Sequence, residues 1–353
     1  MSVEKLTINE LLDAYDYIMR VTTSGTPLYQ RAESARYYLQ QLLHYQKLDA
    51  SFDHIRDLVE AEHGGLLVAL PCKAGDTVYE ISNNTDACNG CQHYHAYAHT
   101  RPDGSITPFA YGAMFEGSKI DTKLRSLSGQ APVNSLNATQ EVTAAQANGS
   151  AWTIETWAFW NLIHDLLVLL GKSTNIQAVF GQGHTTGGSS AADLLTTGAL
   201  NTSGQFFGYS DTTHSVKVFH MENFWGDRWD RIVGLIYDNG TYKAKMTPED
   251  GGYNLTGAGY EAIRKGINAT AAGGGWVKNA QQTEQGLFPT DLTGSDTTYD
   301  CDFHYYNPTI VSVPLVGGRC DNGSACGRYL YVNDVSGSAW WGIGASLFLQ
   351  NPS

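Results

Sequence analysis

The spacing of apolar residues predicts three short helices at the start of the chain. Apolar side chains within 8–19 recur at intervals of three and four, which is the period of one helix face. Pro27 and Ser51 stand where the next two helices would begin, and Gly64-Gly65 would end the third. Residues 1–65 are therefore predicted to form a helical unit, which is too small to hold much core alone.

After this unit the pattern changes from helical spacing to short strands. Two β-like runs within 66–81, joined by a turn, predict a small β module over residues 66–118. Residues 119–353 contain two helical segments, 138–147 and 153–170, followed by many short β-like runs that Gly-rich loops connect. The second helical segment is apolar almost all round, so it should be buried. Helices followed by strands in this way predict an α+β domain.

The composition narrows the class of partner. Among the 353 residues, Lys and Arg number 22 and Asp and Glu number 35, which gives a net charge of −13. Such a charge disfavours nucleic acid and anionic membrane surfaces as partners. Only 16% of the residues are charged, against about 25% in an average domain, and 38 are Gly. This composition suits a binding protein with long loops better than a metabolic enzyme.

Targeting and membrane signals are not visible. The first residues are polar, and no apolar signal-peptide stretch follows them. The longest apolar stretch, 157–170, is interrupted by Asn161, His164 and Asp165. It is also shorter than the about 20 residues that a bilayer span needs. We therefore expect no membrane insertion.

A cluster of cysteines and histidines marks the predicted β module. The turn Cys88-Asn89-Gly90-Cys91 directs two side chains at one point, and a further Cys and a His would complete the tetrahedral set that structural Zn²⁺ prefers. The candidate zinc ligands are Cys72, Cys88, Cys91 and His95. The alternative is free thiols beside an exposed His-rich loop, and with a single Cys-x-x-Cys both stay open.

Sequence motifs of common enzymes are missing. The chain has no Gly-x-Ser-x-Gly, no His-Glu-x-x-His and no P-loop. Asp227 and Asp230 alternate with Arg228 and Arg231, which favours a salt-bridged structural turn over a catalytic acid–base pair. His164 lies among core residues and is predicted to be a buried histidine with satisfied hydrogen bonds. These observations predict that the protein is not an enzyme.

The stretch 317–345 has the composition of a recognition surface. Gly and Trp residues alternate there with Arg, Tyr, Asn and Asp. A scaffold that holds the backbone would let these side chains of mixed chemistry face a partner. The alternative is a plain surface loop between two strands.

Several of these segments resemble a known family. Residues 161–170, the loop Phe180-Gly181-Gln182-Gly183-His184 and residues 222–230 are similar to the C-type lectin fold of the sulfatase-modifying type. With Gly317-Gly318 and 341–345, they resemble the variable proteins of diversity-generating retroelements, which occur in phages and prophages. The resemblance covers 119–353. It implies a C-type lectin-like domain with two helices and short, mostly antiparallel strands joined by long loops, and a variable region at about 300–345.

The resemblance also implies which side chains contact the ligand. In that family an error-prone reverse transcriptase rewrites adenine positions at the 3′ end of the gene. The positions implied to be diversified and ligand-binding are Arg319, Asp321, Ala325, Arg328, Leu330, Tyr331, Asn333, Ser338 and Gly342. Trp340 and Trp341 cannot arise from Asn codons in this way, so they are expected to be scaffold. The neighbouring positions expected to border the same surface are Asp302, His304, Tyr305 and Tyr306.

The function implied is a non-enzymatic display protein at a phage tail or on a bacterial cell surface. Its partners would be a host cell-surface protein or glycan, other virion or tail subunits, and further copies of itself, with no cofactor required for binding. One alternative is a virion structural protein or adhesin of fixed specificity. Another is an oxidase of the formylglycine-generating type, which uses paired cysteines; Cys320 and Cys326 keep it open. Otherwise these two are expected to be buried, or paired with each other or with Cys301.

Overall fold

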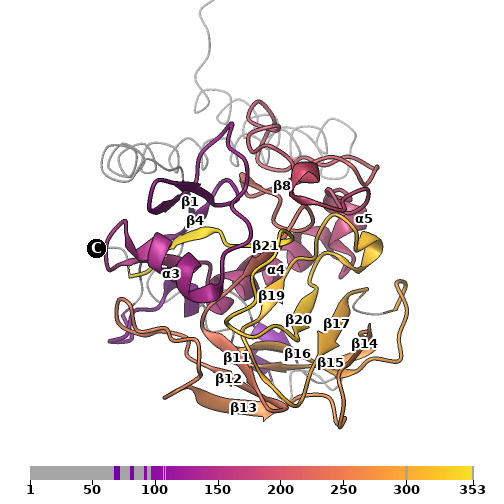
Figure 1. The fold of residues 1–353 in the computed structure, drawn as a ribbon. Helices are drawn as coiled ribbons and strands as arrows, with labels where there is room; N and C mark the ends of the chain where they lie inside the picture. The colour runs from indigo at the N-terminus through magenta and orange to yellow at the C-terminus, as the bar shows by residue number, and fades with distance from the viewer. Residues whose placement is uncertain are drawn as a thin grey trace, which may run out of the picture. The chain divides into compact units, whose positions relative to one another are not determined.

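The computed structural model describes residues 67–71, 80–82, 91–93, 97–105, 107, 109–298 and 301–351. These residues all belong to one unit, Val59–Ser353. The predicted helical unit 1–65 lies outside the described residues. The described part combines a few helices with many short strands, most of them antiparallel, which confirms the α+β class (Figure 1).

The first sheet joins segments from both ends of the described chain. Its strands, in spatial order, are β1 (Leu67–Pro71), β4 (Phe109–Ala113), β22 (Leu347–Leu349) and β7 (Trp152–Ile154), and every neighbouring pair is antiparallel. Strand β22 pairs Phe348 with Gly112 on one side and with Thr153 on the other. The sheet therefore crosses the boundary predicted between residues 118 and 119.

A larger sheet carries the C-terminal region. Its order is β14 (Gly273–Trp276), β17 (Phe303–Tyr306), β20 (Leu330–Val332), β19 (Leu315–Val316), β10 (Trp229–Arg231) and β21 (Ile343–Gly344). The pairs β17–β20 and β10–β21 are parallel, and the others are antiparallel. In Figure 1 the yellow strands β19 and β20 lie beside the orange β17. Residues far apart in the sequence thus form one surface.

The remaining strands form smaller sheets around these two. One has the order β13 (Glu261–Lys265), β12 (Thr241–Ala244), β11 (Leu235–Asp238) and β18 (Val311–Ser312). The pairs are β15 (Asn279–Thr283) with β16 (Gly286–Asp291), β2 (Glu80–Ser82) with β3 (Cys91–His93), β5 (Ser118–Ile120) with β6 (Lys123–Arg125), and β8 (Lys217–Val218) with β9 (Met221–Glu222).

The two predicted helices are present, but the second begins later than predicted. Helix α3 (Ala138–Gln146) has a capping box in which Asn137 accepts from the Gln140 N–H. Helix α4 (Trp157–Gly171) begins after Thr156, which accepts a hydrogen bond from the Phe159 N–H. The prediction placed the cap at Thr153, which was wrong because Trp152–Ile154 pairs with β22 as strand β7. A short helix not predicted from the sequence, α5 (Ile176–Phe180), follows.

Helix α4 lies in the main hydrophobic core, as its apolar pattern predicted. The side chains of Trp157, Phe159, Trp160 and Ile163 are at most 1% exposed. Each large apolar side chain that leaves water stabilises the fold by about 1.5–3 kcal/mol. In the described part of the chain no helix is long and apolar enough to cross a membrane.

His164 is buried, but the prediction that its hydrogen bonds are satisfied was wrong. The side chain is inaccessible to solvent, and neither ring nitrogen has a hydrogen-bond partner. The ring of Trp160 lies edge-on at 4.1 Å between centroids. Burial, assisted by the charge of Arg328, holds the pKa of His164 well below its usual value. The aromatic surroundings therefore keep the imidazole neutral.

Several charged side chains form buried ion pairs. Arg228 contacts Glu116 through Nε at 3.2 Å and Asp230 through Nη2 at 3.4 Å. Arg231 donates from Nε to Glu141 Oε2 at 2.6 Å, and both side chains are fully buried. The structural interpretation of the charged turn is thus confirmed for Arg228 and Asp230.

Glu155 is a buried carboxyl without such a partner. It follows β7, is 6% exposed, and its Oε1 has no hydrogen-bond partner. Burial, and then the negative charge of Asp230, raise its pKa well above the ordinary value of 4.5. In the folded protein this group therefore keeps its proton at pH values where it is ionised in the unfolded chain.

Replacing Glu155 by Gln is expected to stabilise the protein more as the pH rises. The native contribution of this carboxyl is fully present below about pH 4.5, where both states hold the proton, and is lost as the pH rises toward the folded pKa. Above about pH 5, the difference in unfolding free energy should grow with pH, by at most about 1.4 kcal/mol per pH unit. Urea denaturation across this range measures it, with the exposed Glu261→Gln as the matched control. Equal pH profiles for both variants would contradict the prediction.

Candidate ligand-binding site

One face of the six-stranded sheet is covered with aromatic side chains. Strand alternation places Tyr305 of β17 next to Tyr331 of β20, and Tyr331 next to Leu315 of β19. These rings pack with buried Trp229 and Tyr329 into a cluster separate from the main core. We call the following set the aromatic face: Trp229, Phe303, Tyr305, Tyr329, Tyr331 and Trp340.

The rings of the aromatic face support one another. Tyr305 and Tyr331 are stacked, with centroids 5.3 Å apart and planes 19° from parallel. Trp229 contacts Tyr329 edge-on at 4.6 Å and Tyr331 at 5.2 Å. The Tyr331 hydroxyl accepts a hydrogen bond from Asn333 Nδ2 at 3.0 Å. Tyr305, Tyr331 and Asn333 are partly exposed, so fixed rings and a polar amide both reach solvent.

Glycine in the edge strand makes room for one of these rings. A Cβ on Gly274 of β14 would lie 2.5 Å from Tyr305 Cδ2 and 2.9 Å from Phe303 Cε1. Such distances are too short for any side chain, so the ring of Tyr305 rests against bare backbone. Gly274 thus explains how the aromatic face continues to the edge of the sheet.

Two tryptophans and an arginine form one end of the site. The rings of Trp340 and Trp341 are 6.0 Å apart and nearly perpendicular, at 81°. The guanidinium carbon of Arg319 lies 4.6 Å from the centroid of Trp340 and 4.9 Å from that of Trp341. Arg319 also pairs with Asp321. The two tryptophans, predicted to be scaffold, are therefore part of the accessible surface as well.

The implied ligand-binding positions divide into two groups. Seven of them are exposed or partly exposed: Arg319, Asp321, Ala325, Arg328, Tyr331, Asn333 and Ser338. Leu330 is 4% exposed and points into the main core, opposite to Tyr331, because neighbouring strand residues alternate. Gly342 is buried, and a Cβ there would lie 2.1 Å from the ring of Trp340. The placement of Leu330 and Gly342 on the ligand-binding surface is therefore corrected.

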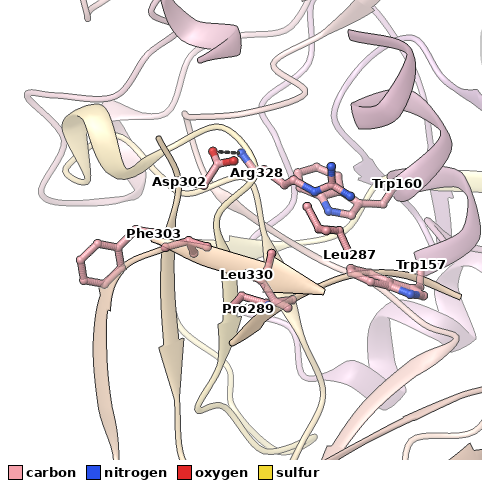
Figure 2. A pocket seen from close by; sticks show the side chains of 10 residues that line it. Trp157, Trp160, Leu287, Pro289, Asp302, Phe303, Arg328 and Leu330 are labelled. Carbon is pink, nitrogen blue, oxygen red and sulfur yellow. Dashed lines mark hydrogen bonds between the residues drawn. The ribbon is translucent and has the colours of Figure 1, made fainter. Parts of the chain in front are cut away.

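Arg328 makes structural contacts with helix α4, and its role as a ligand contact stays a prediction. Its Nη1 donates to Asp165 Oδ1 and its Nη2 to Asn161 Oδ1, both at 3.1 Å, so it attaches the loop before β20 to helix α4. The Arg328 backbone N–H donates to Asp302 Oδ1 at 2.9 Å, as Figure 2 shows. Only 13% of the Arg328 side chain and 9% of the Asp165 side chain are exposed.

A small cavity lies beside this anchor (Figure 2). Most of its wall is apolar, and Arg328 and Asp302 supply the polar groups. The remaining lining residues are Trp157, Trp160, Val277, Ala280, Leu287, Pro289, Phe303 and Leu330. The Arg328 guanidinium already donates to Asp165 and Asn161 of α4. We therefore do not include this cavity in the candidate ligand-binding surface.

Two of the residues predicted to border the surface have different positions in the structure. Tyr305 lies on the aromatic face, whereas His304 is buried, with its Nε2 3.0 Å from the Tyr242 hydroxyl. Trp229 and Tyr329 were missed altogether. Tyr329 could have been found from the two-residue period that links it to Tyr331, but nothing local in the sequence connects Trp229 to this face.

Cys320 and Cys326 are free thiols. Cys320 and Cys326 are at most 1% exposed, which confirms the expectation of burial rather than that of a disulfide. Their packing needs glycine neighbours, since a Cβ on Gly188 or Gly318 would overlap the sulfur. Burial raises the pKa of Cys320 to about 12 and that of Cys326 well above its usual value. Both groups are therefore protonated at neutral pH, which favours packing over thiolate chemistry.

The zinc prediction falls mostly outside the described residues. Cys72, Cys88 and His95 are not among them, and for Cys91 only the strand position in β3 is described. Within the described ranges, no group of three or more His, Cys, Asp or Glu side chains is arranged to hold a metal ion. The four-ligand site stays a prediction.

No protein-family model matches the chain, and no curated protein matches it.

Proposed function

We propose that the protein is a non-enzymatic binding protein that contacts its ligand with the aromatic face and the exposed positions around it. The carrying observation is that Tyr305 and Tyr331 are partly exposed on a sheet whose other side belongs to the main core, and that the partly exposed Trp340 packs against the same aromatic cluster. Tyrosine, tryptophan and arginine are the residues that most often dominate binding energies at interfaces. Their rings lose little conformational entropy when they are already packed.

The arrangement suits a surface whose side chains change while the fold stays. The exposed or partly exposed positions Asp321, Ala325, Asn333 and Ser338 all lie outside the strands. The strands beneath them are held by Arg328 to α4 and by the six-stranded sheet. We therefore propose a C-type lectin-like domain whose surface is diversified by a retroelement. Placed at a phage tail or on a cell surface, it would recognise a host protein or glycan, and several copies would raise weak affinities through avidity.

Sequencing the 3′ end of the gene in a natural population tests this proposal. Substitutions should concentrate at codons 319, 321, 325, 331, 333 and 338 and match a nearby template repeat that carries adenines. The codons of Arg328, Leu330 and Gly342 serve as the internal control, because Leu330 and Gly342 are buried and the Arg328 side chain is bonded to helix α4. If these three codons vary as often as the exposed codons, diversification is not confined to exposed positions, and the proposal is contradicted. An invariant 3′ end without a template would leave an adhesin of fixed specificity.

A further inference from the structure

The corner formed by Trp340 and Trp341 already holds a cation. Two nearly perpendicular indole rings provide two walls, and the Arg319 guanidinium lies within 5 Å of both centroids. The Asp321 carboxylate, on the same loop, pairs with that guanidinium. Aromatic rings attract cations through the negative potential of their faces, and cages of this kind recognise guanidinium and quaternary ammonium groups. The protein's own side chain therefore shows which chemistry the corner accepts.

The Trp340 wall of this corner is held independently of the arginine. The Trp340 ring packs over Gly342, where a Cβ would lie 2.1 Å from it, and joins the aromatic face. The Trp340 carbonyl accepts from the Ile343 N–H at 3.1 Å and from the Ser135 N–H at 3.2 Å. The Trp340 wall should therefore persist when Arg319 is replaced, and the Trp341 ring still packs against it.

Arg319 itself is held less firmly than the walls. Its side chain is 20% exposed and that of Asp321 is 34% exposed. Ion pairs at such exposed positions contribute little to stability, because water and salt screen them. A competing cation can thus displace the guanidinium without unfolding the loop.

We propose that Trp340, Trp341 and Asp321 form a cage for a cationic group of the ligand, a guanidinium or a quaternary ammonium, which takes the place of Arg319. This inference rests on the proposed binding function and names the ligand chemistry of one part of the same surface. The net charge of −13 also favours a cationic partner. Residue 319 then decides specificity: arginine fills the cage from within, and an uncharged residue leaves it open.

The test compares the full-length wild-type protein with Arg319→Ala, using tryptophan fluorescence and the indole N–H signals in NMR. N-acetyl-arginine amide and tetramethylammonium are the cationic probes, and N-acetyl-citrulline amide and neopentanol are their neutral counterparts. Arg319→Ala should bind a cationic probe with a Kd on the order of millimolar. The wild type should bind it about tenfold more weakly, because its own arginine competes.

Further variants identify the cage and the source of the cation. Asp321→Asn in the Arg319→Ala background should weaken binding of the cationic probes and leave the melting temperature unchanged. Preference for the arginine probe indicates a polypeptide ligand, and preference for tetramethylammonium indicates a choline-type group. No saturable binding by Arg319→Ala, or equal binding of the neutral counterparts, would overturn the cage. This result is separate from the sequencing test, since probe binding needs no diversification.

Discussion

Replacing Arg231 by Met is expected to lower the free energy of unfolding by about 3–5 kcal/mol, because it leaves a buried carboxylate without its counter-ion. Arg231 and Glu141 are both inaccessible to solvent, and their charged atoms lie 2.6 Å apart. Burial already raises the pKa of Glu141 to about 7 despite this partner. Arg231 also donates from Nη2 to the Ser338 carbonyl at 2.8 Å. Removal of the Arg231 side chain should therefore also make the loop around Ser338 more mobile.

Urea denaturation of three variants checks this expectation. Lys243→Met is the matched control, since Lys243 and Asp238 form an equally short pair at 2.6 Å with side chains 30% and 23% exposed. It should cost no more than about 1 kcal/mol. The double variant Arg231→Met/Glu141→Leu should recover much of the loss, because neither charge then stays buried. Equal losses for Arg231→Met and Lys243→Met would refute the importance of the buried pair.

Replacing Arg328 by Met should also destabilise the protein, by about 3 kcal/mol, because it leaves Asp165 unpaired in a mostly buried position. Asp165 Oδ2 already has no hydrogen-bond partner, and Asn161 Oδ1 would lose its donor as well. The sequence-based interpretation of Arg328 as a ligand contact requires the opposite result, a loss of binding with unchanged stability.

Thermal unfolding monitored by circular dichroism distinguishes the two roles of Arg328. Arg319→Met is the matched control, since it removes the same side chain from a more exposed position on the same segment. A melting temperature for Arg328→Met close to that of Arg319→Met would return Arg328 to the binding surface. A clearly lower one identifies it as the anchor of the loop before β20.

Local features of the fold could be predicted from the sequence, whereas the pairing of strands distant in the sequence could not. The apolar pattern predicted α4 because one helix carries the whole signal in consecutive residues. Its start was misplaced because Trp152–Ile154 suits either a helix or a strand, and the choice is made by Leu347–Leu349, which lies nearly 200 residues away.

For the candidate site, too, local features could be predicted from the sequence, whereas contacts between distant side chains could not. The stretch 317–345 was found because its composition is unusual, and seven of its nine proposed contacts reach solvent. The two-residue period of β20 could have separated Leu330 from Tyr331. The role of Arg328 could not be predicted, since it depends on Asp165 in a helix 163 residues earlier in the chain.

The position of β22 has a consequence for any gene whose 3′ end is rewritten. This strand follows the proposed variable stretch and lies between β4 and β7, so both lose their shared partner when it is missing. A stop codon or frameshift within codons 319–342 removes it, whereas a missense change at an exposed codon does not. Faulty copies would then fail to complete the first sheet and be cleared as unfolded chains. Only chains in which the reading frame is intact through β22 would then fold.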